Sequence, residues 1–281
     1  MYSNPITYST PISLTSEKLL EHLFFINLEH RTDRLIMVKH ELSKLKPNIG
    51  TRFNAIKAAS GAVGCTLSHI KCLEKARDEG LPHVFICEDD IKFLNPHLLM
   101  KNIQKFCETI PEWDVLVIGG NAVPPYQPIG DFCVRVFNIQ TTTGYIIRQH
   151  YYDTLINNFR EGLKLLISNP INKREYAIDM YWKRLQATGN WFFITPPTVC
   201  QQEGFSDIEN THTNYSHLML DMKKEWLVRP QMPLAMPLAM PLAMPLAMPL
   251  ATPLATPLAT QTSAIAEFGV KNPPSLSLQF N

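Results

Sequence analysis

The sequence lacks an excess of charge of either sign. Its 281 residues carry 26 Lys and Arg against 25 Asp and Glu, a formal net charge of +1. Nonspecific nucleic-acid binding needs a positive surplus, so we expect no nucleic-acid partner. Hydrophobic residues make up 45% of the chain, which is enough for a folded core and excludes a wholly disordered chain or a coiled coil.

No two cysteines have the C-x-x-C spacing of a zinc or redox site. All six lie in apolar segments, and we interpret them as reduced core residues of a cytosolic protein. They are Cys65, Cys72, Cys87, Cys107, Cys133 and Cys200. Residues 1–16 have neither a basic start nor the apolar run of a secretory signal, so we expect a loose leader and a cytoplasmic location.

A tetrapeptide array divides the chain. Residues 232–259 are five Met-Pro-Leu-Ala units followed by two Thr-Pro-Leu-Ala units. Proline at every fourth position removes a helical hydrogen bond in each turn, so we expect no transmembrane segment here. Residues 226–281 are predicted to be a disordered, low-complexity tail, with a membrane or partner anchor as the alternative. The folded domain is predicted over residues 17–225.

Apolar runs rich in β-forming residues alternate with helical patterns in this domain, which is typical of an α/β protein with a parallel sheet. Strands are predicted at residues 22–28, 52–56, 83–87, 113–118, 132–137, 143–147 and 191–195. Helices with apolar residues three and four positions apart are predicted to follow about residues 32, 64, 96, 152 and 178.

Three consecutive acids follow one predicted strand directly. Glu88, Asp89 and Asp90 come after the apolar run at residues 84–87. Ligands of open α/β sheets bind beyond the carboxyl ends of the strands. Adjacent carboxylates repel one another unless a cation lies among them, and oxygen ligands suit Mg²⁺ or Mn²⁺. A solvated turn with an Asp helix cap is the alternative.

A second cluster follows the first predicted strand. Asn27, Arg31 and Arg34 lie there, at the start of a predicted helix. Guanidinium groups beside a helix N-terminus favour a phosphate or nucleotide. The alternative is that Thr32 or Asp33 caps the helix and the arginines pair with nearby acids.

The third cluster places Ser68 and His69 in the helix that precedes the acidic strand, after the small residues of the Gly64-Cys65-Thr66 start. We count both among the candidate ligand contacts. A histidine in such a helix is otherwise a core residue whose ring bonds a carbonyl.

Together these clusters resemble glycosyltransferase family 25, which holds bacterial lipooligosaccharide galactosyltransferases and collagen hydroxylysine galactosyltransferases. The resemblance spans about residues 22–210. The matching strings, in chain order, are Phe25-Ile26-Asn27-Leu28 with Arg31 and Arg34, Gly64-Cys65-Thr66-Leu67-Ser68-His69, Glu88-Asp89-Asp90 with Ile91 and Phe93, Thr142-Thr143-Gly144-Tyr145, Asp179, and Gln201 or Gln202 with Ser206-Asp207-Ile208.

The resemblance implies a GT-A-type, Rossmann-like nucleotide-sugar-binding fold that uses Mn²⁺ or Mg²⁺ to hold a UDP-sugar donor, with a glycan or a hydroxylated protein as acceptor. Galactose is the donor sugar that the family favours, and lipooligosaccharide biosynthesis is the implied setting. Asp90 is the first candidate metal ligand and Glu88 the second. The implied nucleotide-sugar contacts are Asn27, Arg31, Arg34, Ser68, His69, Glu88 and Asp89.

The family inverts the anomeric centre by direct displacement, which requires a carboxylate to take the proton of the acceptor hydroxyl. Asp179 and Asp207 are both candidates, and the sequence leaves the choice open. Asp179 is otherwise an acid at a helix N-terminus, and Asp207 a turn residue. His212 is a weaker candidate for a further metal contact.

Three other classes of protein share some of these sequence features. A phosphoacceptor receiver domain has its acidic pair after the first strand, where this chain has Asn27 and arginines, so that class is excluded. A metal-dependent phosphodiesterase could use the Glu88 cluster and stays an alternative, but it needs further His and Asp ligands in pairs, and the sequence has no H-x-H site. A module that binds a nucleotide sugar without catalysis stays an alternative.

Overall fold

The computed structural model describes residues 14–227. The tetrapeptide array, the rest of the predicted tail beyond residue 227 and residues 1–13 of the predicted leader lie outside the described residues. The main feature is an eight-stranded sheet, in the order β2-β1-β3-β8-β5-β9-β7-β6. Its strands are β1 (Leu23–Asn27), β2 (Thr51–Asn54), β3 (His83–Glu88), β5 (Val115–Ala122), β6 (Tyr126–Ile129), β7 (Cys133–Val136), β8 (Ile139–Arg148) and β9 (Trp191–Ile194).

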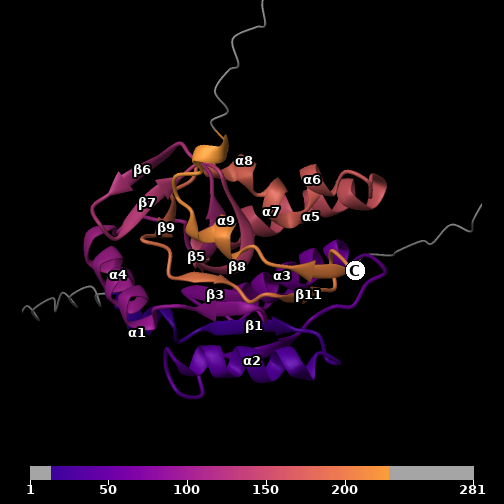
Figure 1. Cartoon of the computed structure of the whole chain (residues 1–281), viewed down its shortest axis with the longest axis horizontal. Coiled ribbons are helices and arrows are strands. Elements are labelled where there is room, and N and C mark those ends of the chain that lie inside the picture. The colour runs from indigo at the N-terminus through magenta and orange to yellow at the C-terminus, as the bar shows by residue number, and fades with distance from the viewer. Residues whose placement is uncertain (1–13, 228–281) are drawn as a thin grey trace, which may run out of the picture. The chain divides into compact units, whose positions relative to one another are not determined.

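The helices pack on both faces of this sheet (Figure 1). Their bounds are α1 (Ser16–Leu19), α2 (Thr32–Ser43), α3 (Gly61–Asp78), α4 (Pro96–Thr109), α5 (Tyr152–Ser168), α6 (Lys173–Tyr176), α7 (Ile178–Tyr181), α8 (Lys183–Gln186) and α9 (Ser216–Leu220). Short 3-10 turns occupy Gln149–Tyr151 and Glu225–Leu227. The predicted α/β class is confirmed.

Alternation along the strands decides which helices cover which face. Phe24 and Ile26 of β1 belong to one buried cluster, which contains residues of α3, α5 and α7. Phe25 points to the opposite cluster, which contains residues of α1, α2 and α4. Successive side chains of a strand point to opposite faces, so this pattern requires a helical layer on each side.

Local sequence explains where several helices begin and end. The Asn95 side chain accepts a hydrogen bond from the backbone N–H of Leu98, and Pro96 occupies the first position of α4, as the sequence predicts. Gly80 follows α3 with a φ of 64°, a left-handed conformation that glycine adopts without strain.

The sheet is mixed, which corrects the expectation of a parallel sheet. β1 pairs in parallel with β2 and β3, and β5 pairs in parallel with β9, but β8 runs antiparallel between β3 and β5. No helix separates β5 from β8. Neighbouring strands can be parallel only when a crossover connection returns the chain to its starting edge, so β8 reverses direction.

Two small sheets lie beside the main one and were missing from the expected elements. β4 (Ile91–Phe93) pairs antiparallel with β10 (Val199–Gln201), which brings Gln201 next to the turn that carries the acids. β11 (Gly204–Ser206) and β12 (Thr211–Thr213) form a hairpin, which we call the 204–213 hairpin.

Across residues 14–227, every helix is too short or too polar to cross a membrane. Over the same part of the chain all six cysteines are free thiols. Four of them are buried as predicted, whereas Cys65 and Cys107 are partly exposed.

Candidate active site

The acidic triplet stands at the carboxyl edge of the sheet, as the sequence predicts. Glu88 is the last residue of β3, and Asp89 and Asp90 form the turn into β4. A cavity of about 880 Å³ opens at this edge. Eight of the predicted site residues line it, namely Arg34, Ser68, His69, Glu88, Asp89, Asp90, Asp179 and Asp207.

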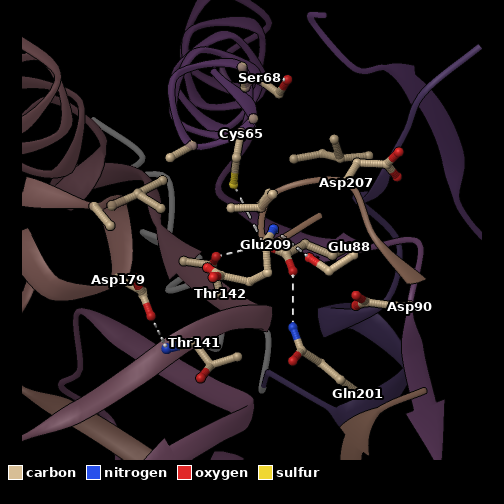
Figure 2. A pocket seen from close by; sticks show the side chains of 18 of the residues that line it. Cys65, Ser68, Glu88, Asp90, Thr141, Thr142, Asp179, Gln201, Asp207 and Glu209 are labelled. Atoms are coloured by element: carbon tan, nitrogen blue, oxygen red, sulfur yellow. Dashed lines mark hydrogen bonds between the residues drawn. The ribbon is translucent and has the colours of Figure 1, made fainter. Parts of the chain in front are cut away.

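Glu88 is the most heavily hydrogen-bonded acid of the site. Its Oε1 accepts a hydrogen bond from Thr142 Oγ1 at 2.6 Å and a weaker one from Cys65 Sγ at 3.9 Å, and His69 Nε2 lies 3.3 Å from the same oxygen. Gln201 Nε2 donates to Oε2 at 3.5 Å (Figure 2). Burial alone raises the pKa of Glu88, but the contact with His69 and the Thr142 hydroxyl outweigh it and hold the pKa below its ordinary value.

Asp89 is held by protein groups on both oxygens. Asn27 Nδ2 donates to Oδ2 at 2.7 Å, and Arg34 donates to Oδ1 at 2.8 Å. Burial raises the pKa of Asp89 against the opposing effect of the Arg34 charge. Asn27 and Arg31, which were predicted as nucleotide-sugar contacts, do not line the cavity, and Asn27 Nδ2 also donates to the Arg31 carbonyl at 3.1 Å.

Asp90 differs from its two neighbours. Its Oδ1 is buried and has no hydrogen-bond partner among the described residues, and its Oδ2 lies 3.4 Å from an Arg34 nitrogen. Burial and the nearby Glu88 charge raise the pKa of Asp90 well above its ordinary value. A buried carboxylate oxygen without a donor is unfavourable unless a proton or a cation occupies it.

This arrangement fits a hard divalent cation at Asp90. The unpartnered Oδ1 is an oxygen ligand of the kind that Mg²⁺ and Mn²⁺ take, usually together with water and substrate phosphates. Glu88 already accepts several hydrogen bonds from the protein, so it has less free capacity for the same ion.

The two candidate bases have different surroundings. Asp179, at the start of α7, accepts the backbone N–H of Thr141 at 3.1 Å, and burial raises its pKa. In the view of Figure 2, Asp179 and Asp90 lie on either side of Glu88. Asp207 instead forms an ion pair with Arg31, and 37% of its side chain is exposed.

Both arginines fasten the 204–213 hairpin to the rim. Arg31 bridges Asp33 and Asp207, and Arg34 donates to the carbonyl of Phe205 at 2.7 Å. The hydrogen bond from Arg31 lowers the pKa of Asp33 to about 2. The hairpin in turn contributes Ser206–Glu209 to the cavity lining.

The polar groups of Ser68 and His69 bind other protein groups in the cavity wall. The Ser68 hydroxyl donates to the carbonyl of Gly64 at 2.7 Å and accepts the backbone N–H of Ile56 at 2.8 Å. His69 is fully buried, with Nδ1 2.9 Å from the hydroxyl of Tyr145. His212 is exposed on β12, outside the lining, against the ring of Phe205.

Several lining residues had no predicted role. The sequence predicts Cys65 as a core residue. Thr142 and Gln201 belong to the strings that resemble family 25, but the sequence gives them no separate role. Lys57, Lys173 and Arg174 also line the cavity, and their isolated charges gave no pattern that sequence reasoning could use.

A family model described as glycosyltransferase family 25, LPS biosynthesis protein, matches residues 57–118. The resemblance to glycosyltransferase family 25 is confirmed. The matched segment includes α3, β3 and the acidic triplet, and therefore one wall and the rim of the cavity.

Two family 25 relatives show the extent of the similarity. A mouse protein named "Inactive glycosyltransferase 25 family member 3" is 24% identical over 152 residues, which is 52% of this chain and 24% of that protein. A Drosophila pseudoobscura pseudoobscura protein named "Glycosyltransferase 25 family member" is 24% identical over 204 residues, which is 60% of this chain and 31% of that protein. The chain thus spans less than a third of either relative.

A solved structure is also similar. It is the crystal structure of a glycosyltransferase involved in the glycosylation of the major capsid of PBCV-1, with a TM-score of 0.41 and 10% identity, covering 67% of this chain and 95% of that chain. A likeness at this TM-score bears neither on the reaction nor on the GT-A subdivision of the fold, which stays a prediction.

Proposed function

We propose that this chain is a metal-dependent, inverting glycosyltransferase that moves a hexose, galactose by preference, from a UDP-sugar to a hydroxyl of a glycan or a hydroxylated protein. The observation that carries the proposal is the pairing of two unlike carboxylates in one cavity. Asp90 offers an unpartnered oxygen that suits a cation, and Asp179 offers a carboxylate with a raised pKa. A cavity of about 880 Å³ is within the ordinary range for small-molecule sites.

Asp90 is the proposed ligand of Mn²⁺ or Mg²⁺, with Glu88 as the second carboxylate of the site. The bound ion would supply positive charge against the departing diphosphate. Asp89 is kept in place by Asn27 and Arg34, so the turn that carries Asp90 is rigid before the donor binds. Preorganised charge of this kind stabilises a transition state without the cost of rearranging the site.

Asp179 is the proposed general base. In a direct displacement the acceptor oxygen forms a bond to the anomeric carbon, the bond from that carbon to the diphosphate oxygen breaks, and the acceptor proton moves to the carboxylate. A raised pKa brings Asp179 closer to the pH at which a base works best. Asp207 is less suited because the Arg31 guanidinium occupies it.

Cationic side chains on the cavity wall support a phosphate-bearing donor. Lys57, Lys173 and Arg174 line the cavity together with the acids. Ammonium and guanidinium groups at a concave surface favour phosphate oxygens. We assign them to the diphosphate or to an anionic part of the acceptor.

The alternative function is a nucleotide-sugar-binding module without catalysis. The name of the mouse relative carries the word "inactive", which gives this reading its support. The two functions differ in one outcome, because both predict metal-dependent binding of a UDP-sugar and only the enzyme predicts release of UDP.

The deciding experiment measures UDP release from a panel of UDP-sugars with Mn²⁺, Mg²⁺ or EDTA. We compare the full chain with Asp90→Asn, Asp179→Asn and the control Asp131→Asn, whose carboxylate pairs with Lys105 on the surface. Metal-dependent release should fall about 100-fold or more in the first two variants and stay unchanged in the control. Calorimetry measures the binding of UDP to the same proteins. UDP binding without UDP release supports the binding module, and the absence of both overturns the nucleotide-sugar assignment.

A further inference from the structure

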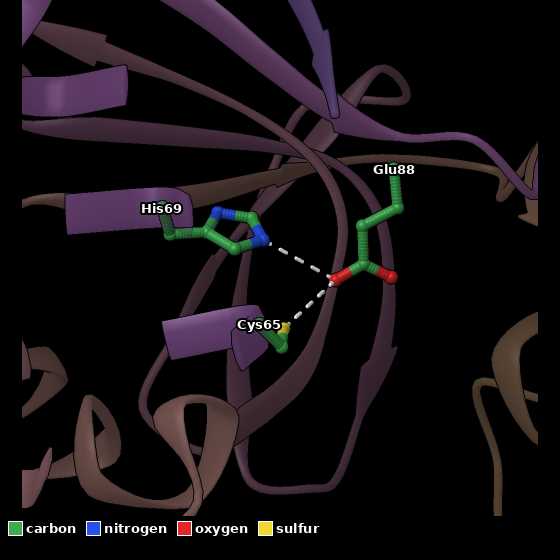
Figure 3. Close-up of side chains that lie close together, drawn as sticks. All are labelled: Cys65, His69 and Glu88. Atoms are coloured by element: carbon green, nitrogen blue, oxygen red, sulfur yellow. Dashed lines mark hydrogen bonds and ion pairs between the residues drawn. The ribbon is translucent and has the colours of Figure 1, made fainter. Parts of the chain in front are cut away.

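Three side chains of metal-binding type meet on the cavity wall. Cys65 and His69 are four residues apart on α3, which places them on one face of the helix. Glu88 ends the neighbouring strand β3. The sulfur, the Nε2 nitrogen and the carboxylate oxygen all lie within 4.8 Å of one another, and Figure 3 shows the first two directed at the same Glu88 oxygen.

Two of the three separations between these atoms are close to those of a tetrahedral zinc site. His69 Nε2 is 3.3 Å from Glu88 Oε1, and Cys65 Sγ is 3.9 Å from the same oxygen. Zinc bonds of about 2.0 Å to nitrogen and oxygen and about 2.3 Å to sulfur place tetrahedral ligand atoms roughly 3.3–3.6 Å apart. Both separations are within a few tenths of an ångström of these values, and the third, from Cys65 Sγ to His69 Nε2, is no more than 4.8 Å.

The histidine is already oriented as a metal ligand. Its ring is fully buried, and Nδ1 lies 2.9 Å from the Tyr145 hydroxyl, which leaves Nε2 facing the cavity. Histidine ligands characteristically engage their second ring nitrogen in a hydrogen bond, which fixes the ring. Tyr145 is itself fully buried, so this support is rigid.

Charge and access also favour an ion. A thiolate, a carboxylate and a neutral imidazole carry two negative charges, so a divalent ion makes the buried group neutral. Zinc binds the Cys65 sulfur as the thiolate. On binding, the S–H bond breaks, the metal–sulfur bond forms and the thiol proton leaves to water, while the neutral imidazole binds through Nε2 and carries its own proton on Nδ1, beside the Tyr145 hydroxyl. All three residues line the cavity, which gives the ion a path.

We propose that Cys65, His69 and Glu88 form a zinc site on the cavity wall, with its fourth ligand position open to the cavity. This site differs in chemistry from Asp90, because sulfur and imidazole select zinc whereas isolated carboxylate oxygens suit Mn²⁺ or Mg²⁺. The two sites share Glu88, but the zinc site does not depend on the proposed transfer reaction.

The test titrates the reduced, metal-free full chain with Co²⁺, a spectroscopic substitute for zinc. We expect a thiolate-to-cobalt charge-transfer band that saturates near one equivalent and disappears when Zn²⁺ is added. The band should vanish in Cys65→Ser and persist in Cys107→Ser, a matched control because Cys107 is also a partly exposed thiol on a helix and lies outside the lining. Zinc affinity should fall at least about tenfold in Cys65→Ser.

A second measurement keeps the test decisive if Cys65→Ser does not fold. The wild-type chain is alkylated with and without Zn²⁺, and each cysteine is followed by peptide mass spectrometry. Zinc should protect Cys65 and leave Cys107 unprotected. Absence of the charge-transfer band in the wild type, or equal labelling of Cys65 with and without zinc, overturns the proposal.

Discussion

The hydroxyl of Thr142 donates a hydrogen bond to Glu88 Oε1 at 2.6 Å, across the boundary between β8 and β3. The next residue, Thr143, is fully buried, and its hydroxyl has no hydrogen-bond partner among the described residues. Of these two adjacent threonines, only Thr142 has a hydroxyl that contacts an acid.

The Thr142→Val variant should lose about 1–3 kcal/mol of unfolding free energy, because it removes the shortest of the hydrogen bonds that the Glu88 carboxylate accepts. Thr143→Val removes only an unpaired hydroxyl and should be neutral or stabilising. Urea denaturation of both variants at pH 7 measures the difference. Equal losses would show that the Thr142 hydroxyl contributes nothing specific.

Gly64→Ala should destabilise the protein by about 1–3 kcal/mol. A Cβ at Gly64 would lie 2.5 Å from the backbone oxygen of Ile56, so the start of α3 would have to move away from the chain that follows β2. Gly204→Ala is the control, since a Cβ there meets nothing within 4 Å, and its effect should stay within about 0.5 kcal/mol. Thermal unfolding of both variants provides the comparison.

Arg34→Met should cost about 3 kcal/mol at pH 7, because it leaves the Asp89 carboxylate in a largely buried position without its cation. The matched surface change, Arg77→Met, removes exposed pairs with Asp78 and Asp153 and should cost less than about 1 kcal/mol. Chemical denaturation distinguishes the two. Similar small losses would mean that solvent already screens the Arg34 pair.

Asp179→Asn should abolish the proposed activity and stabilise the metal-free protein. Burial raises the folded-state pKa of Asp179, so the native state binds this proton more tightly than the unfolded chain does. Stability from this group is therefore present at low pH and is lost as the pH rises from the ordinary Asp value of about 4 through the raised pKa.

The measurement is the unfolding free energy of wild type and Asp179→Asn between pH 4 and pH 8. The unfolding free energy of the variant should rise relative to that of the wild type as the pH rises. The amide oxygen of the variant can still accept the Thr141 N–H, and it carries no charge to bury. A constant difference across this range would contradict the pKa shift.

Much of the fold could be predicted from periodicity. The strand at His83–Glu88 and the helix at Pro96–Thr109 were expected within one or two residues, because an apolar run and an Asn-Pro cap mark them locally. The short strands β4 and β10 were not expected, because three-residue strands carry no periodic signal and exist only through their pairing.

The site could be predicted only in part. The rim position of Glu88, Asp89 and Asp90 followed from strand direction alone. The residues that set their environments are distant in sequence, since Thr142 lies 54 positions and Gln201 lies 113 positions from Glu88. Their proximity depends on the reversed direction of β8 and the pairing of β10 with β4, which no local pattern encodes.

Strand β8 supplies contacts to three groups of the cavity at once. The Thr141 N–H meets Asp179, the Thr142 hydroxyl meets Glu88, and the Tyr145 hydroxyl meets His69. A shift of this strand by one residue would displace all three contacts together. An insertion within β8 that changes its register would therefore disturb several parts of the cavity at once. Engineering of its selectivity is best directed at wall positions on other segments, such as Lys173 and Tyr215.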